Sequence, residues 1–202
     1  ITLERLEQSV KRILASKKEY GILDDPLPRR ENLSSLASPE NLELARRIAR
    51  ESITLVRDGA SLIPLSPQET IPLIWPAELE RALAPLVEEC PFLQPRLLPL
   101  GASGAEIEKL LDSLRGSALV LAGTSNLRRY PPWIDLLNTL AEETGLVLLA
   151  LSSPYDLLAV PRAGACLCTY SHTGVSMQAL AEVLKGTLAP RGRLPVELPG
   201  LD

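Results

Sequence analysis

Apolar residues recur at three- and four-residue intervals over residues 3–19, and lysine and glutamate fill many of the positions between them. This spacing predicts an amphipathic helix, which Gly21 ends because glycine readily adopts the left-handed cap conformation. A second helix is predicted over residues 38–51, where the Ser38 hydroxyl is placed to cap the first turn. Residues 24–37 join the two helices and are rich in proline and charge, which predicts a linker that crosses a surface.

From residue 53 onward, short apolar segments alternate with longer amphipathic ones. The predicted strands cover residues 53–56, 71–75, 96–100, 118–122, 146–151, 165–169 and 194–198, and the predicted helices cover residues 77–89, 105–114, 132–144 and 175–185. The strands at 118–122 and 146–151 are apolar throughout, as strands buried on both faces are. The alternation predicts an α/β fold, a three-layer α/β/α sandwich with a mostly parallel sheet.

Loops that follow the carboxyl ends of parallel strands gather at one edge of the sheet, where ligands and partners usually meet such a fold. Three polar loops are predicted there, over residues 123–130, 152–156 and 170–174. Gly123 is expected to let the backbone turn sharply as it leaves its strand. The candidates for contact with a substrate or a neighbouring domain are Asn126, Arg128, Arg129, Tyr155, Asp156 and His172.

Each candidate also has a structural interpretation. Arg128 and Arg129 are suited to pairing with a carboxylate on a substrate or a facing domain, although a solvated loop is the favoured interpretation. Asp156 needs a second carboxylate across a sugar bond to act as a catalytic acid, and no close-spaced partner is visible, so capping is favoured. His172 is the only histidine and lacks a recognisable nucleophile or orienting acid, which favours a structural or solvated role. No residue is assigned a catalytic role.

Composition narrows the classes of function. The net charge is −4 with acidic and basic residues interspersed, unlike the basic surface of a nucleic-acid-binding protein. No apolar run approaches the roughly 18 residues that span a bilayer. Three cysteines and one histidine indicate neither a disulfide framework nor a zinc site. No phosphate-binding glycine motif follows a strand, so neither a metal nor a cofactor is expected.

The order and spacing of several segments resemble the family 3 glycoside hydrolases over nearly the whole chain. Residues 6–24 look like the closing helix of that family's (β/α)8 barrel, and residues 50–58 are similar to the entry strand of its second domain. The Ser-Pro-Tyr-Asp segment at residues 153–156 resembles the N-acetylglucosaminidase branch. The most specific element is Gly186 followed by the run A-P-R-G-R-L-P-V-E-L-P-G at residues 189–200.

The resemblance implies three parts: residues 1–23 as the last helix of a missing N-terminal barrel domain, residues 24–37 as a linker, and residues 38–202 as the C-terminal α/β domain. It implies a retaining mechanism in which a barrel aspartate attacks the anomeric carbon. In the favoured branch a barrel histidine, paired with an aspartate, is the acid/base, and His172 does not match it. The implied parent is an exo-β-N-acetylglucosaminidase that removes terminal N-acetylglucosamine from cell-wall-type or chitin-type glycans.

This chain alone is therefore expected to be inactive. The expected partners are the missing barrel and, through the parent enzyme, a carbohydrate substrate, and the surface left by the barrel is open to self-association. The chain begins at Ile1 without an initiator methionine, so we expect it to be cut from a longer protein, and its location is left open between cytoplasmic and secreted.

Two alternatives remain. In the first, the parent is a β-glucosidase or β-xylosidase, in which the resemblance implies an acid/base glutamate from the second domain. Glu142 and Glu143 lie in a predicted helix, which counts against them. In the second, the chain is an independent module that binds a small polar ligand or a protein at the sheet edge.

Overall fold

The computed structural model describes residues 1–66 and 70–201, and the chain divides into two compact units, Ile1–Leu42 and Glu43–Asp202. Unit 1 contains the helix α1 (Leu3–Glu19), the 3-10 helix η1 (Arg30–Ser35) and the first residues of α2 (Pro39–Ser52). The helix predicted over residues 3–19 is present with those bounds, and η1 lies within the predicted linker.

The apolar face of α1 meets no core within unit 1. No residue of α1 is buried. The exposed fractions are 55% for Leu6, 44% for Val10, 55% for Ile13 and 47% for Leu14. Since these side chains share one face of the helix, the pattern of α1 is typical of a helix that packs against a partner, although this face is exposed.

Unit 2 is built on a six-stranded sheet with the order β1-β6-β5-β4-β2-β3. The strands are β1 (Thr54–Asp58), β2 (Ile71–Pro76), β3 (Leu93–Leu98), β4 (Leu119–Thr124), β5 (Gly145–Ala150) and β6 (Ala165–Cys168). Neighbouring strands run parallel except β1, which pairs with β6 in the antiparallel sense. The prediction of a mostly parallel sheet is confirmed.

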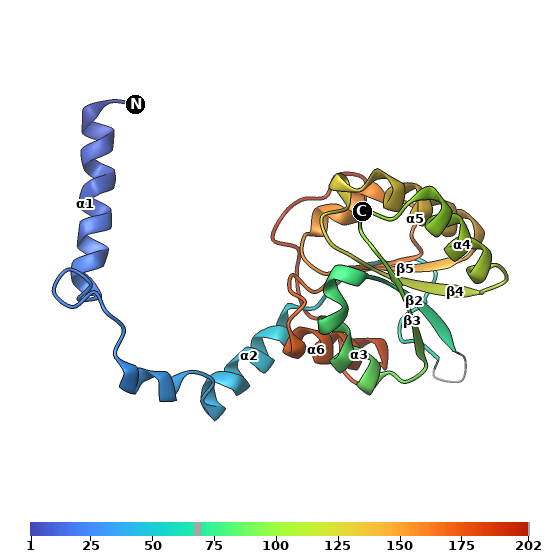
Figure 1. Ribbon diagram of the computed structural model, residues 1–202, viewed down its shortest axis with the longest axis horizontal. Helices are drawn as coiled ribbons and strands as arrows, with labels where there is room; N and C mark the ends of the chain where they lie inside the picture. The colour runs from blue at the N-terminus through green and yellow to red at the C-terminus, as the bar shows by residue number, and fades with distance from the viewer. Residues whose placement is uncertain (67–69, 202) are drawn as a thin grey trace. The chain divides into compact units, whose positions relative to one another are not determined.

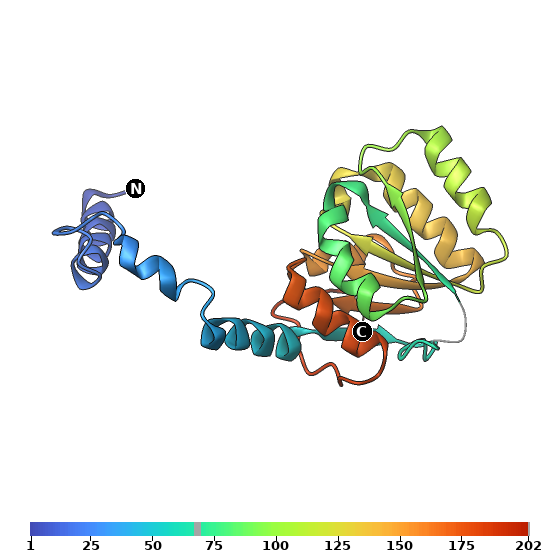
Figure 2. The same cartoon turned by 60° about the horizontal axis from the view of Figure 1, so that its bottom comes forward.

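Helices cover both faces of this sheet, as Figures 1 and 2 show. One face carries α3 (Glu80–Glu89) and α6 (Gly174–Leu184), and the other carries α4 (Gly104–Leu114) and α5 (Pro131–Glu143). Successive side chains of one strand enter different cores, so that Leu149 of β5 packs beneath α3 and α6 while Leu148 packs beneath α4 and α5. The predicted three-layer α/β/α sandwich is therefore confirmed.

Short 3-10 helices are the next elements after three of the strands. They are η2 (Ala77–Leu79) after β2, η3 (Leu127–Arg129) after β4 and η4 (Pro154–Ala159) after β5. Both η3 and η4 begin in the polar loops predicted from the sequence, so these loops are more ordered than a plain turn.

The edge strand β3 begins at Leu93, earlier than the strand predicted over residues 96–100. The Ile71 N–H donates to the Phe92 carbonyl at 2.9 Å. In a parallel ladder the backbone groups of alternate residues face the same neighbour, so those of Pro95 point away from β2. Proline is tolerated at such an outward position because no ladder hydrogen bond needs its missing N–H. A strand predicted to start only after Pro95 is therefore wrong.

The strand predicted over residues 194–198 is also wrong, since this tail forms no ladder with a described strand. Pro195 and Pro199 lack the N–H groups that a ladder requires. The tail is anchored instead by Leu198 and Leu201, whose side chains are 5% and 4% exposed and join the core beneath α4 and α5.

Candidate functional site

The loop after β4 starts from a close contact between Gly123 and the indole ring of Trp75. Gly123 lies inside β4 without a positive φ, so the expectation that it turns the backbone is wrong. A Cβ atom here would lie 2.6 Å from Cε3 of Trp75. The indole N–H of Trp75 donates to the Leu79 carbonyl at 2.9 Å, which fixes the ring in place. The turn itself comes at Asn126, whose φ of 56° is one that asparagine tolerates.

Two contacts tie the loop after β4 to the loop after β5. The Oγ atoms of Ser125 and Ser152 lie 3.0 Å apart. The Leu127 N–H donates to Oδ1 of Asp156 at 2.9 Å. Leu127 is the first residue of η3, so Asp156 caps that short helix from a different loop. The two loops therefore form one cross-linked unit.

The Asp156 side chain is only 2% exposed. Burial raises the pKa of its carboxyl above the ordinary value, and hydrogen bonding from the Leu127 N–H, the Thr124 hydroxyl and the Asn126 N–H opposes the rise. Its Oδ2 atom is buried and has no partner with hydrogen-bond geometry among the described residues. Asp156 braces the backbone and is closed to a substrate.

The loop after β6 is held by its own side chains and by β1. Tyr170 has a φ of 56°, and its hydroxyl donates to Oγ1 of Thr54 at 2.9 Å. The hydroxyls of Thr173 and Ser176 lie 3.0 Å apart at the start of α6. His172, between these two anchors, is exposed and has no hydrogen bond to another described residue.

The remaining candidates project from the braced loops into solvent. Asn126, Arg128, Arg129 and Tyr155 are all exposed. The side-chain amide of Asn126 makes only a long contact of 3.4 Å with Oγ of Ser125. Neither arginine has an ion-pair partner within residues 1–66 and 70–201. The edge therefore presents polar and cationic groups on a rigid base.

These side chains do not form a set able to cleave a glycosidic bond. A retaining glycosidase needs a nucleophile and an acid/base, which in the canonical case are two carboxyl groups about 5–5.5 Å apart. Among the six candidates Asp156 is the single carboxylate, and it is buried. Glu142 lies on α5 and pairs with Arg162 at 2.6 Å. Over the residues that the structure describes, no group of three or more His, Cys, Asp or Glu side chains is arranged to hold a metal ion.

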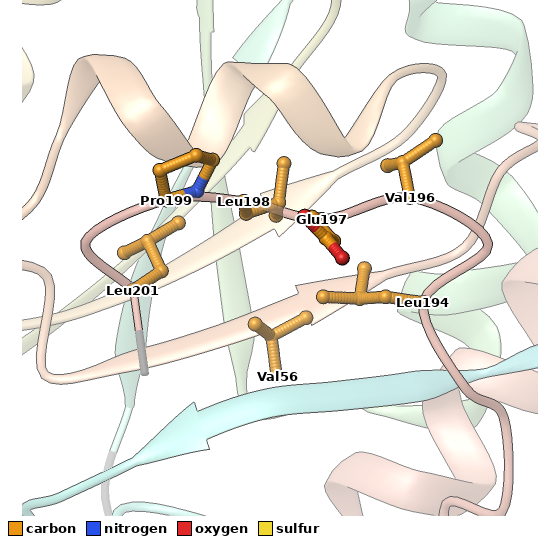
Figure 3. A pocket seen from close by; sticks show the side chains of 7 residues that line it. All are labelled: Val56, Leu194, Val196, Glu197, Leu198, Pro199 and Leu201. Carbon is orange, nitrogen blue, oxygen red and sulfur yellow. The ribbon is translucent and has the colours of Figure 1, made fainter.

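A cavity of about 620 Å³ lies at the C-terminal tail and involves none of the six candidates. Figure 3 shows Val56 of β1 on one side of it and the tail on the other. The tail residues that line it are Leu194, Val196, Glu197, Leu198, Pro199 and Leu201. One signal of this surface is visible in the sequence: apolar residues recur regularly along the tail, and the strand prediction misassigned them.

No helix of the described chain is both long and apolar enough to cross a membrane. No protein-family model matches the sequence. The chain is 26% identical over 240 aligned residues to a β-N-acetylglucosaminidase/β-glucosidase of Cellulomonas fimi, and the match covers 98% of this chain and 39% of that protein. This chain thus spans about two fifths of the length of that curated relative.

Solved structures are also similar to this chain over nearly its whole length, and each match covers only part of the solved chain. A family 3 β-N-acetylglucosaminidase from Paenibacillus sp. str. FPU-7 matches with a TM-score of 0.73 and 24% identity, over 96% of this chain and 40% of that one. The β-glucoside phosphorylase BglX matches with a TM-score of 0.67 and 25% identity, over 100% of this chain and 40% of that one.

Proposed function

Because this chain is the C-terminal domain of a family 3 glycoside hydrolase, we propose that it is a non-catalytic scaffold for a retaining exo-β-N-acetylglucosaminidase. The observation that carries the proposal is the state of the edge loops. Their one carboxylate among the candidates is buried against a backbone N–H, while the exposed groups are polar or cationic. Such an edge suits contact with a neighbouring domain that holds the reactive groups.

The unpacked face of α1 supports a neighbour upstream. Full burial of one large apolar side chain contributes about 1.5–3 kcal/mol, and four such side chains of α1 stay partly in water. We assign residues 1–23 to the last helix of an upstream (β/α)8 barrel, residues 24–37 to a linker and residues 38–202 to the α/β domain. The curated relative is long enough to contain a further domain.

The proposed substrate is terminal N-acetylglucosamine on cell-wall-type or chitin-type glycans. The support is the Ser-Pro-Tyr-Asp segment at residues 153–156 and the name of the C. fimi relative, which includes both N-acetylglucosaminidase and glucosidase activities. A β-glucosidase or β-xylosidase parent remains the alternative. The protein extended upstream through its neighbouring domain should hydrolyse an aryl β-N-acetylglucosaminide faster than the matching glucoside or xyloside. The reverse order would reject the branch and leave the scaffold role standing.

The proposed role of α1 predicts a different response in the two forms of the protein. Replacing Leu6 with aspartate should change the free energy of unfolding of this chain by no more than about 0.5 kcal/mol, because the side chain is not packed. In the upstream-extended protein the same change should cost about 2 kcal/mol or more, since a charge would then be buried. Chemical denaturation of both forms measures this, with Lys11→Ala on the polar face as the control. Equal effects in both forms would contradict a docked α1.

A further inference from the structure

A second surface, independent of the edge loops, lies between the edge strand β3 and α4. It is a groove of about 430 Å³. This is within the range of about 300–1,000 Å³ that is typical of ligand sites. Its lining comes from two elements and the turn between them: Pro95, Arg96, Leu97, Leu98, Pro99, Glu106, Lys109, Leu110 and Ser113. The α4 members recur at three- and four-residue intervals, so they form one stripe of the helix beside the strand.

The strand side of this groove has a free backbone at one position. Alternation along the β2–β3 ladder turns the backbone groups of Pro95 and Leu97 away from β2. Pro95 has no N–H, and its carbonyl accepts from Nη1 of Arg96 at 3.2 Å. Leu97 keeps its N–H and carbonyl without a partner in the described chain, and its side chain is 42% exposed. Pro95 therefore offers no free backbone group on the outer edge of β3, whereas the N–H and carbonyl of Leu97 remain available for pairing.

The charges on the groove favour an anionic occupant. Glu106 is occupied, because its carboxylate accepts from the backbone N–H and the hydroxyl of Ser103 at 2.8 and 2.7 Å. Lys109 is exposed and has no ion-pair partner among the described residues. Arg96 lines the same groove, and its guanidinium has no ion-pair partner among the described residues. The unpaired charges on the groove are therefore positive, and the rest of its lining is mainly leucine and proline.

We infer that this groove binds an extended peptide segment of another protein, one that alternates apolar and acidic side chains. The segment adds to β3 through the N–H and carbonyl of Leu97. Its apolar side chains lie on Leu97 on one face of the sheet, and its carboxylates lie on the other face, toward Lys109 and Arg96. Strand addition beside a helix is a recurring mode of peptide recognition, in which the backbone gives affinity and the side chains give specificity. The single open rung of the ladder predicts weak, reversible binding.

The test is a titration of the isotopically labelled chain followed by amide chemical shifts. The probes are an acetylated tetrapeptide amide of alternating valine and glutamate and its valine–lysine counterpart. The glutamate peptide should shift the amides of Leu97 and Lys109. Lys109→Glu should weaken its binding about fivefold and favour the lysine peptide, as expected for one exposed ion pair. Leu97→Pro should remove binding while the edge strand folds, because Pro95 already occupies the equivalent outward position.

Arg81→Glu is the matched control, because it makes the same charge change on α3, on the opposite face of the sheet, and should leave binding unchanged. Three results would overturn the inference. The first is an absence of shifts at Leu97, and the second is equal binding of both peptides that Lys109→Glu does not alter. The third is a dimer in sedimentation that Leu97→Pro dissolves, since the occupant would then be a second copy of this chain.

Discussion

Replacing Gly192 with alanine is expected to lower the free energy of unfolding of unit 2 by about 3 kcal/mol. The Gly192 N–H donates to the Ile53 carbonyl at 2.9 Å, which ties the tail to the start of β1. A Cβ atom at this position would lie 2.7 Å from the same carbonyl oxygen, and it would also strike the Ser52 carbonyl and Oγ1 of Thr54. Two of these atoms belong to the backbone, so they cannot move aside as a flexible side chain does.

Thermal unfolding measures this effect, and the melting temperature should fall by roughly 6–12 °C. Gly101→Ala is the control, because a Cβ atom there meets nothing within 4 Å and the backbone has no positive φ. The control should stay within about 0.5 kcal/mol of the original chain. If the two variants unfold alike, the tail does not pack on β1 as described.

The second large effect is expected at Asp156. Replacement with alanine should cost about 2 kcal/mol, because the Leu127 N–H then loses its acceptor in a buried site. Asparagine keeps an oxygen at that position, so Asp156→Asn should cost less than Asp156→Ala at neutral pH. Denaturant titration of the two variants measures the difference. An alanine variant as stable as the asparagine variant would show that the two loops are not tied through this side chain.

The same carboxyl predicts a pH dependence. Because burial raises the pKa of Asp156 in the folded state, the folded chain binds this proton more tightly than the unfolded chain does. Its contribution to stability is full below the ordinary aspartate pKa and is lost as the pH rises through the raised value. Cys168 faces the carboxyl, but burial raises the pKa of its thiol to about 12, so it stays neutral in this range. Asp156→Asn should therefore gain stability relative to the original chain as the pH rises, and a constant difference would contradict this.

Much of the fold could be predicted from the sequence because periodicity reports burial. The apolar strands β4 and β5 fill cores on both faces, and α1 shows the helical spacing of a docked helix. The wrong predictions concern residues whose role depends on a neighbouring strand. Pro95 is tolerated in β3 because its backbone groups point away from β2, and Gly123 is required because the Trp75 ring leaves no room for a side chain. Neither relation between strands can be recognised before the sheet order is known.

The candidate site was predicted in part. The sheet does bring the loops after β4 and β5 together, as parallel strands require. The contacts that join them were not foreseen, because the Leu127 N–H and the Ser125 and Ser152 hydroxyls meet only across a strand order that the sequence does not state. Whether Arg128 or Tyr155 touches a sugar or a neighbouring domain stays a prediction.

The central claim is that the reactive groups of the parent enzyme lie outside this chain. Its most direct test is an assay of the purified chain on aryl β-N-acetylglucosaminide and aryl β-glucoside. We expect no turnover above the background of a mock sample purified in the same way from cells that do not express the chain. Turnover that survives repeated purification and disappears on substituting His172 or Asp156 would contradict the account, since a catalytic set would then be assembled within these residues.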